Sequence, residues 1–176
     1  MKKIAVILCL LIGQFAYAQA PTSSKETVQN KMKALDWLTG KWKGEGWMSF
    51  GPDQKHTFTQ TENIQFKLDN TVLLIEGNGK NSNRTVHDAL ALMTYDVQDN
   101  NYTFHSYTGE GRHQTDANVT VGDKKMIWQM DNNPERLIRY TIQLNEKNQW
   151  HEIGEMSSDQ GKSWNKFFEM TLNKMK

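Results

Sequence analysis

The sequence predicts an all-β protein: an antiparallel meander of about ten strands, closed into a barrel and preceded by one short helix. Three observations support this. Apolar residues show helical spacing over residues 24–39, and the pattern changes to strict alternation after Gly40. Turn residues then recur about every 10 to 13 residues as far as residue 173. Closure is expected because it removes the exposed edges of the sheet; a β-sandwich is the alternative.

The first 18 residues have the features of a secretory signal peptide. Two lysines precede an apolar run from Ile4 to Ile12, and Ala16-Tyr17-Ala18 fits a small-residue cleavage site. The run is shorter than the ~20 residues that a membrane-spanning helix needs. We therefore expect an exported protein, periplasmic or extracellular, with residues 19–176 as a single barrel domain and no integral membrane segment.

Composition limits the classes of partner. The only cysteine, Cys9, lies within the expected signal peptide, so the exported chain would have no disulfide and would depend on its core for stability. The formal net charge is +1 at pH 7. A near-neutral chain without runs of like charge does not favour nucleic acid as a partner, because phosphate binding needs a basic face.

The helix is predicted over residues 24–39. A capping box fits at its start, with Ser23 as the N-cap and Glu26 three residues later. Gly40 stands where helix C-caps use glycine. The apolar residues between them are expected to pack on the barrel; they are Val28, Met32, Leu35 and Leu38.

From Gly40 onward the residues alternate between two phases. Trp42 and Met48 share a phase with two glycines in the first expected strand. In the second, one phase contains His56, Phe58, Gln60, Glu62, Ile64 and Phe66. Further strands are expected near residues 71–78, 84–96, 100–108, 112–121, 124–130, 136–145, 148–156 and 163–173, and the separators include a loop from Gly77 to Asn83.

Residues 157–164, SSDQGKSW, resemble the Asp-box turn found in the propeller blades of sialidases. A propeller enzyme would need several copies of this motif and a longer chain, so the single copy predicts a hairpin turn and not a glycosidase. Asp159 and Ser157 would cap the backbone amides of the turn, and Gly161 would supply a positive φ angle. Trp164 would cover the turn.

No catalytic residue and no metal site is predicted. The chain lacks a Gly-x-Ser-x-Gly elbow, and its five histidines have no His-x-His or His-x-x-x-His spacing. Acidic residues on strands have two interpretations: structural ion pairs or a solvated face, or a polar centre that orients a ligand inside the barrel. These residues are Glu62, Glu76, Asp88, Glu152, Glu155 and Glu169.

A barrel of about eight to ten strands can enclose a small ligand. A carboxylate that faces such a lumen must be paired, hydrogen-bonded or protonated, and arginines are natural partners for it. The candidate ligand-binding residues are Trp42, Glu62, His105, Arg112, Arg139 and Glu152.

Three stretches resemble a known group of barrels. LDWLTGKWKGEG (residues 35–46) looks like the entry to a calycin-type barrel, with the Gly-x-Trp element that lipocalins share. ALMTYDVQDNNYTFHSYTGEG (91–111) and WHEIGEMSSDQGKSWNKFFEMTL (150–172) resemble small secreted bacterial barrels of unknown function in that superfamily. The resemblance covers residues 33–173 and implies a calycin-like, or lipocalin-like, fold.

The nitrobindin-like barrels of the same superfamily are distantly similar. They bind heme iron through a histidine late in the chain, and this sequence has no histidine after His151. Heme is therefore disfavoured, and no cofactor is predicted.

The leading hypothesis for function is a small-molecule-binding barrel that holds a mostly apolar or amphipathic ligand in its lumen. An isomerase or hydrolase that uses lumen carboxylates is an alternative from another class. The third is a structural or interaction module of the cell envelope, with a homodimer among its expected forms.

Overall fold

The computed structural model describes residues 24–49, 51, 54–115, 118–130 and 135–176. The expected signal peptide and Ser23 lie outside these residues. The elements, in chain order, are α1 (Ser24–Met32), the 3₁₀ helix η1 (Lys33–Leu38), β1 (Gly40–Ser49), β2 (Lys55–Lys67), β3 (Val72–Asn81), β4 (Arg84–Asp96), β5 (Asn101–Thr108), β6 (His113–Gln114), β7 (Asn118–Gly122), β8 (Lys125–Met130), β9 (Leu137–Leu144), β10 (Trp150–Ser157) and β11 (Asn165–Lys174).

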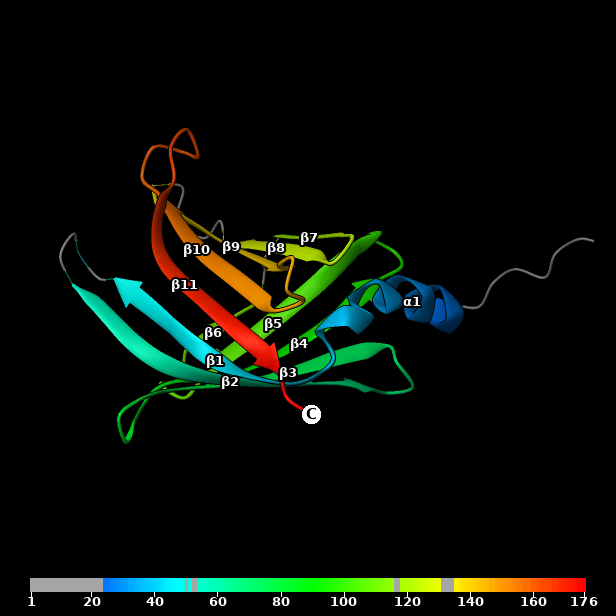
Figure 1. The fold of residues 1–176 in the computed structure, drawn as a ribbon. Helices are drawn as coiled ribbons and strands as arrows, with labels where there is room; N and C mark the ends of the chain where they lie inside the picture. Colours follow the sequence, from blue (N-terminus) through cyan, green and yellow to red (C-terminus); the bar gives the residue numbers. More distant parts are fainter. Residues whose placement is uncertain (1–23, 50, 52–53, 116–117, 131–134) are drawn as a thin grey trace, which may run out of the picture.

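All eleven strands form one antiparallel sheet that curls around a central space (Figure 1). Its order is β6-β5-β4-β3-β2-β1-β11-β10-β9-β8-β7, so the last strand returns to pair with the first. This confirms the predicted all-β barrel class with one short N-terminal helical segment. The strand expected over residues 112–121 is instead two short strands, β6 and β7, which form the two edges of the sheet.

The two ends of the sheet lie near each other, with β5 beside β7. Within the described residues, no hydrogen-bonded ladder joins these ends. Aromatic side chains bridge them instead: the rings of Phe104 on β5 and Trp128 on β8 stack with centroids 4.9 Å apart. Side-chain packing therefore completes the wall where strand pairing does not.

The helical segment closes one end of the barrel. Its first part is α-helical, and its last turns tighten into a 3₁₀ helix that ends at Leu38. Met32, Leu35 and Leu38 are fully buried, which agrees with the predicted apolar stripe. The indole nitrogen of Trp42 donates a hydrogen bond to the Leu38 carbonyl at 2.7 Å, so the segment is tied to the first strand.

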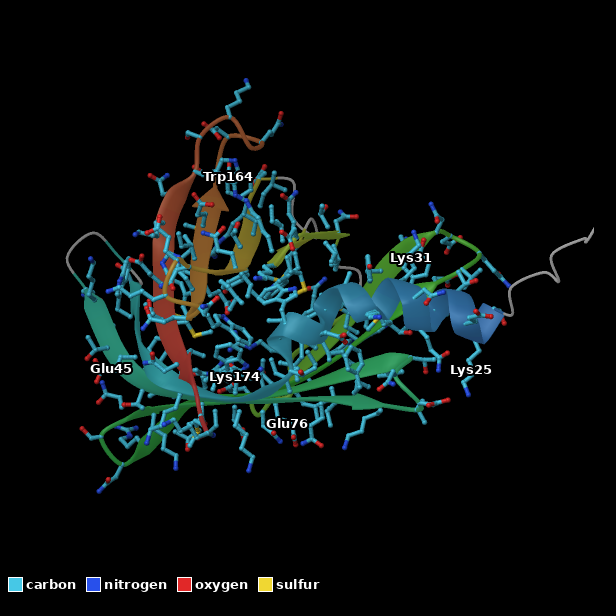
Figure 2. The ribbon with its side chains drawn as sticks, turned by 45° about the vertical axis from the view of Figure 1, so that its right-hand side comes forward. Lys25, Lys31, Glu45, Glu76, Trp164 and Lys174 are labelled. Carbon is cyan, nitrogen blue, oxygen red and sulfur yellow. The ribbon has the colours of Figure 1, made fainter. Side chains whose placement is uncertain are left out.

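Contacts along the helix fix it to the barrel rim. The ammonium group of Lys25 lies 2.6 Å from the Asp69 carboxylate, and Gln29 donates a hydrogen bond to the Asp69 carbonyl. Farther along, the Tyr102 hydroxyl donates to the Lys31 carbonyl at 2.9 Å. Figure 2 shows Lys25 at the tip of the helix and Lys31 nearer the strands.

The SSDQGKSW motif forms the β10–β11 turn. The Asp159 carboxylate accepts hydrogen bonds from the Ser163 amide and hydroxyl and from the Ser157 hydroxyl. Those bonds, chiefly the one from the Ser163 side chain, lower the pKa of Asp159 to about 2. Gly161 has φ of +85°, and Trp164 donates to its carbonyl at 3.1 Å. The motif therefore has a structural role that its own side chains fully explain.

Among the described residues, no helix is long and apolar enough to cross a membrane.

Candidate functional site

The curled sheet encloses two adjoining chambers, with volumes of about 410 and about 440 Å³. The first extends from Leu38 of the closing helix toward Arg112. The second lies toward the β1–β2 and β3–β4 hairpins, where Met48 and Arg84 line it. Glu62, His87 and Glu152 line both chambers, so two carboxyl groups and an imidazole lie where the chambers meet.

Glu62 is buried in the middle of β2, with 7% of its surface exposed. The alternation of this strand turns Gln60, Glu62 and Ile64 inward together, and these residues share one phase in the sequence. One Glu62 oxygen accepts a hydrogen bond from the Gln60 amide nitrogen at 2.7 Å. Gln60 is itself only 2% exposed, so the two polar side chains form a buried unit on one strand.

Glu152 faces the lumen from β10 and is also 7% exposed. It accepts a hydrogen bond from the Trp150 indole nitrogen at 3.0 Å. The Trp150 ring meets the Trp42 ring edge-on, with centroids 5.9 Å apart, and Trp42 is directly opposite Glu62 in the β1–β2 ladder. The structure thus brings together three of the six predicted ligand-binding residues, Trp42, Glu62 and Glu152.

Burial controls the charge of both carboxyl groups. It raises the pKa of Glu62 to about 8, although the Gln60 hydrogen bond opposes this and the neighbouring Glu152 adds to it. Burial raises the pKa of Glu152 to about 7 against the Trp150 hydrogen bond. At neutral pH the pair therefore retains protons that exposed glutamates would have lost.

Two glycines of β3 make room for this polar unit. Gly77 and Gly79 pair directly with Glu62 and Gln60 in the β2–β3 ladder. A Cβ atom on Gly77 would lie 2.8 Å from a Glu62 carboxylate oxygen, and one on Gly79 would lie 2.6 Å from the Gln60 amide oxygen. The expected loop from Gly77 to Asn83 is wrong: these glycines lie inside a strand because their neighbours occupy the side-chain space.

Aromatic rings on β2, β8, β9 and β11 form an apolar part of the lumen wall. Trp128 and Tyr140 stack with centroids 4.4 Å apart, and Tyr140 meets Phe168 edge-on at 5.7 Å. Phe168 stacks in turn on Phe58 of β2 at 5.8 Å. Burial and the nearby Glu152 raise the pKa of Tyr140, which keeps its hydroxyl neutral. The lumen therefore combines an apolar aromatic wall with one polar centre.

Of the other three predicted residues, two point out of the lumen and Arg112 lies at its rim. Arg139 is on the outer face, where it pairs with Glu155 at 2.8 Å and stacks on Trp164 at 3.9 Å. His105 also points outward, because the residues on either side of it, Phe104 and Ser106, line the first chamber. Arg112 lines that chamber at its rim and is paired with the exposed Glu110 at 3.7 Å.

The remaining acidic candidates are also outside the lumen. Glu76 and Asp88 are exposed and face a polar groove on the outer side of β1–β5; Figure 2 shows Glu76 on the side of the sheet away from the helix. Glu169 pairs with His151 and Lys166 at 3.0 and 2.8 Å. Within the described residues, no group of three or more acidic, histidine or cysteine side chains is arranged to hold a metal.

Sequence reasoning did not select Gln60 and His87 as site residues. Gln60 alternates in the same phase as Glu62, and this shared phase could have identified it as a site residue. His87 lies in the first part of β4, where residues 84–88 are all exposed. Alternation there does not distinguish an inner side of the strand from an outer one. His87 is exposed, yet desolvation by the surrounding protein lowers its pKa.

Comparison with known proteins identifies a family whose function is unknown. The profile of a family described as "Protein of unknown function (DUF1579)" matches residues 27–174. No curated protein matches the sequence. A crystal structure of Rv2717c from M. tuberculosis is similar, with a TM-score of 0.59 and 9% identity over 82% of this chain and 97% of that one. At this identity the likeness shows the fold alone, and a calycin-like barrel fits it.

Proposed function

Because the chain belongs to the DUF1579 family of proteins of unknown function, we propose from its geometry that the barrel binds a small, mostly apolar or amphipathic molecule in its lumen. One observation carries this proposal: two adjoining chambers of about 410 and about 440 Å³, walled by aromatic rings, meet at a buried polar centre. A concave, largely apolar site with a few convergent polar groups is typical of small-molecule binding. The features of residues 1–18 support action outside the cytoplasm.

The test is binding of an uncharged fluorescent probe, N-phenyl-1-naphthylamine, whose emission rises in apolar surroundings. Ser106 faces the first chamber and its neighbour His105 faces outward, so the same substitution at each position gives a matched pair. We expect Ser106→Trp to fill the chamber and weaken probe binding by about tenfold or more. His105→Trp should leave it within about twofold. Equal effects of the two variants, or no probe binding by the native protein, would refute lumen binding.

One observation favours an enzyme as the second candidate. The carboxyl groups of Glu62 and Glu152 line the same chambers and have pKa values of about 8 and about 7, which suits proton transfer near neutral pH. Mass spectrometry of a molecule that co-purifies with the native protein and with Glu152→Gln distinguishes the readings. An enzyme would yield different chemical species from the two proteins, and a binding barrel would yield the same one.

A further inference from the structure

The polar centre of the lumen contains one amide and two carboxyl groups, and the carboxyls become pure hydrogen-bond acceptors when they lose their protons. The Gln60 amide oxygen is buried and has no hydrogen-bond partner among the described residues. Glu62 and Glu152 each use one oxygen to accept a bond from a neighbour on their own strand. The Gln60 oxygen lies against Gly79 and is out of reach of a ligand, whereas the second oxygen of each carboxyl accepts no bond from a described residue and can receive donors from a ligand.

The protein places no cation against these carboxyls. Within the described residues, neither Glu62 nor Glu152 takes part in an ion pair of 4.0 Å or less. The titratable and charged groups that line the same chambers are His56 of β2, Arg84 and His87 of β4, Arg112 just before β6, His113 of β6, and Tyr140 of β9. Both arginines lie at strand ends, toward the rim, and His87 is held toward its neutral form.

This arrangement selects among ligand head groups by charge and by donor number. A carboxylate or phosphate would add negative charge beside two acids in a site of low polarity, which is strongly unfavourable. A hydroxyl offers one donor. A protonated primary amine offers three donors and a positive charge, which match the two carboxyl groups that line both chambers once these are ionised.

We propose that the lumen binds an amphipathic amine, whose ammonium group lies at Glu62 and Glu152 and whose apolar part lies against the aromatic wall. The proposal rests on lumen binding as proposed above and names the chemical class of the ligand. The raised pKa values of the two carboxyls agree with it, because both would lose protons when a cation arrives.

Displacement of the naphthylamine probe by three eight-carbon compounds tests the class. We expect octylamine to displace the probe at about tenfold or more lower concentration than octan-1-ol, and octanoate to be the weakest. The double variant Glu62→Gln/Glu152→Gln should lose this preference and keep its affinity for octan-1-ol. Glu76→Gln, the same change on the outer face, should keep the preference. Equal displacement by amine and alcohol would overturn the proposal and leave lumen binding intact; absence of probe binding would overturn both.

Calorimetry in buffers of different ionisation enthalpy measures how many protons are released on binding. A purely structural role of the two carboxyls would not produce such a release. Octylamine should release protons from the native protein at pH 7, because the ammonium group displaces them from the carboxyl pair. Octan-1-ol should release none, and neither ligand should release protons from the double variant. Octylamine binding without proton release would contradict contact with these carboxyls.

Discussion

The two faces of the sheet treat their carboxylates in opposite ways. On the outer face, Glu155 pairs with Arg139 and Glu169 pairs with Lys166 and His151. The Lys166 hydrogen bond, with a smaller contribution from His151, lowers the pKa of Glu169. On the inner face, Glu62 and Glu152 have no such cation within the described residues, and burial raises their pKa values to about 8 and about 7.

Strand β10 shows the contrast most directly, because Glu152 and Glu155 lie on it three residues apart and face opposite sides. The outer carboxylates pair with cationic side chains of the protein itself. Their contribution to folding stability therefore explains their presence. The inner acids are expensive to bury and incompletely partnered, and this cost is understandable if they serve a ligand. Substitutions on each face test whether inner and outer carboxyls differ in this way.

The inner pair should make the protein less stable as pH rises. A glutamate whose folded-state pKa is raised binds protons more tightly in the folded state, so its ionisation favours unfolding above the usual pKa of 4.5 and up to about 7 or 8. Each pKa unit corresponds to ~1.4 kcal/mol. Urea titrations of the native protein at pH 5 and pH 9 should therefore differ by several kcal/mol in free energy of unfolding.

The variant Glu62→Gln/Glu152→Gln serves as its comparison, since glutamine keeps the shape of the protonated acid. Its stability should change much less between the two pH values and should exceed that of the native protein at pH 9. A native protein that is equally stable at both would mean that the carboxyls are not held in a costly environment.

Gly77→Ala tests the room left for Glu62. The added Cβ atom would lie 2.8 Å from the Glu62 carboxylate oxygen, and overpacking of this kind costs about 1–3 kcal/mol. Gly51→Ala is the control, because nothing lies within 4 Å of its added atom, and a surface change of this type stays within about 0.5 kcal/mol. Thermal unfolding measures both. Similar melting temperatures for the two variants would contradict the close approach of Glu62 to β3.

Glu169→Gln should give the smallest effect, with the opposite pH dependence. Its lowered pKa means that its contribution is present above the ordinary glutamate pKa and is lost as pH falls through the folded-state value. A partly exposed pair of this kind is worth at most about 1 kcal/mol. The variant should be slightly less stable at pH 7 and equal to the native protein near pH 3 in urea titrations. A difference that persists at low pH would argue for packing in place of charge.

Much of the fold follows from local pattern. The change from helical spacing to alternation after Gly40 located the closing helix and the first strand, and the alternation of β2 placed Gln60, Glu62 and Ile64 on one face, which is the inner face in the structure. The SSDQGKSW turn was also readable, because its side chains bond within the motif. These features depend on residues that are close together in the chain.

The remainder depends on what lies across the sheet. Arg139 is a plausible partner for a buried acid by type, but its strand phase turns it to Glu155 and Trp164. Gly77 and Gly79 look like a loop in isolation and belong to a strand because Glu62 and Gln60 fill the space beside them. Neither outcome is visible before the pairing register is known.

The side-chain packing between the two ends of the sheet also determines how the width of the lumen can vary. Between β5 and β8 the described wall is held by the stacked rings of Phe104 and Trp128, and not by a backbone ladder. Where the two ends of the sheet meet, the width of the barrel therefore depends on the size of these two side chains. Substitutions at these positions can therefore widen or narrow the interior from one family member to the next without shifting the register of any strand.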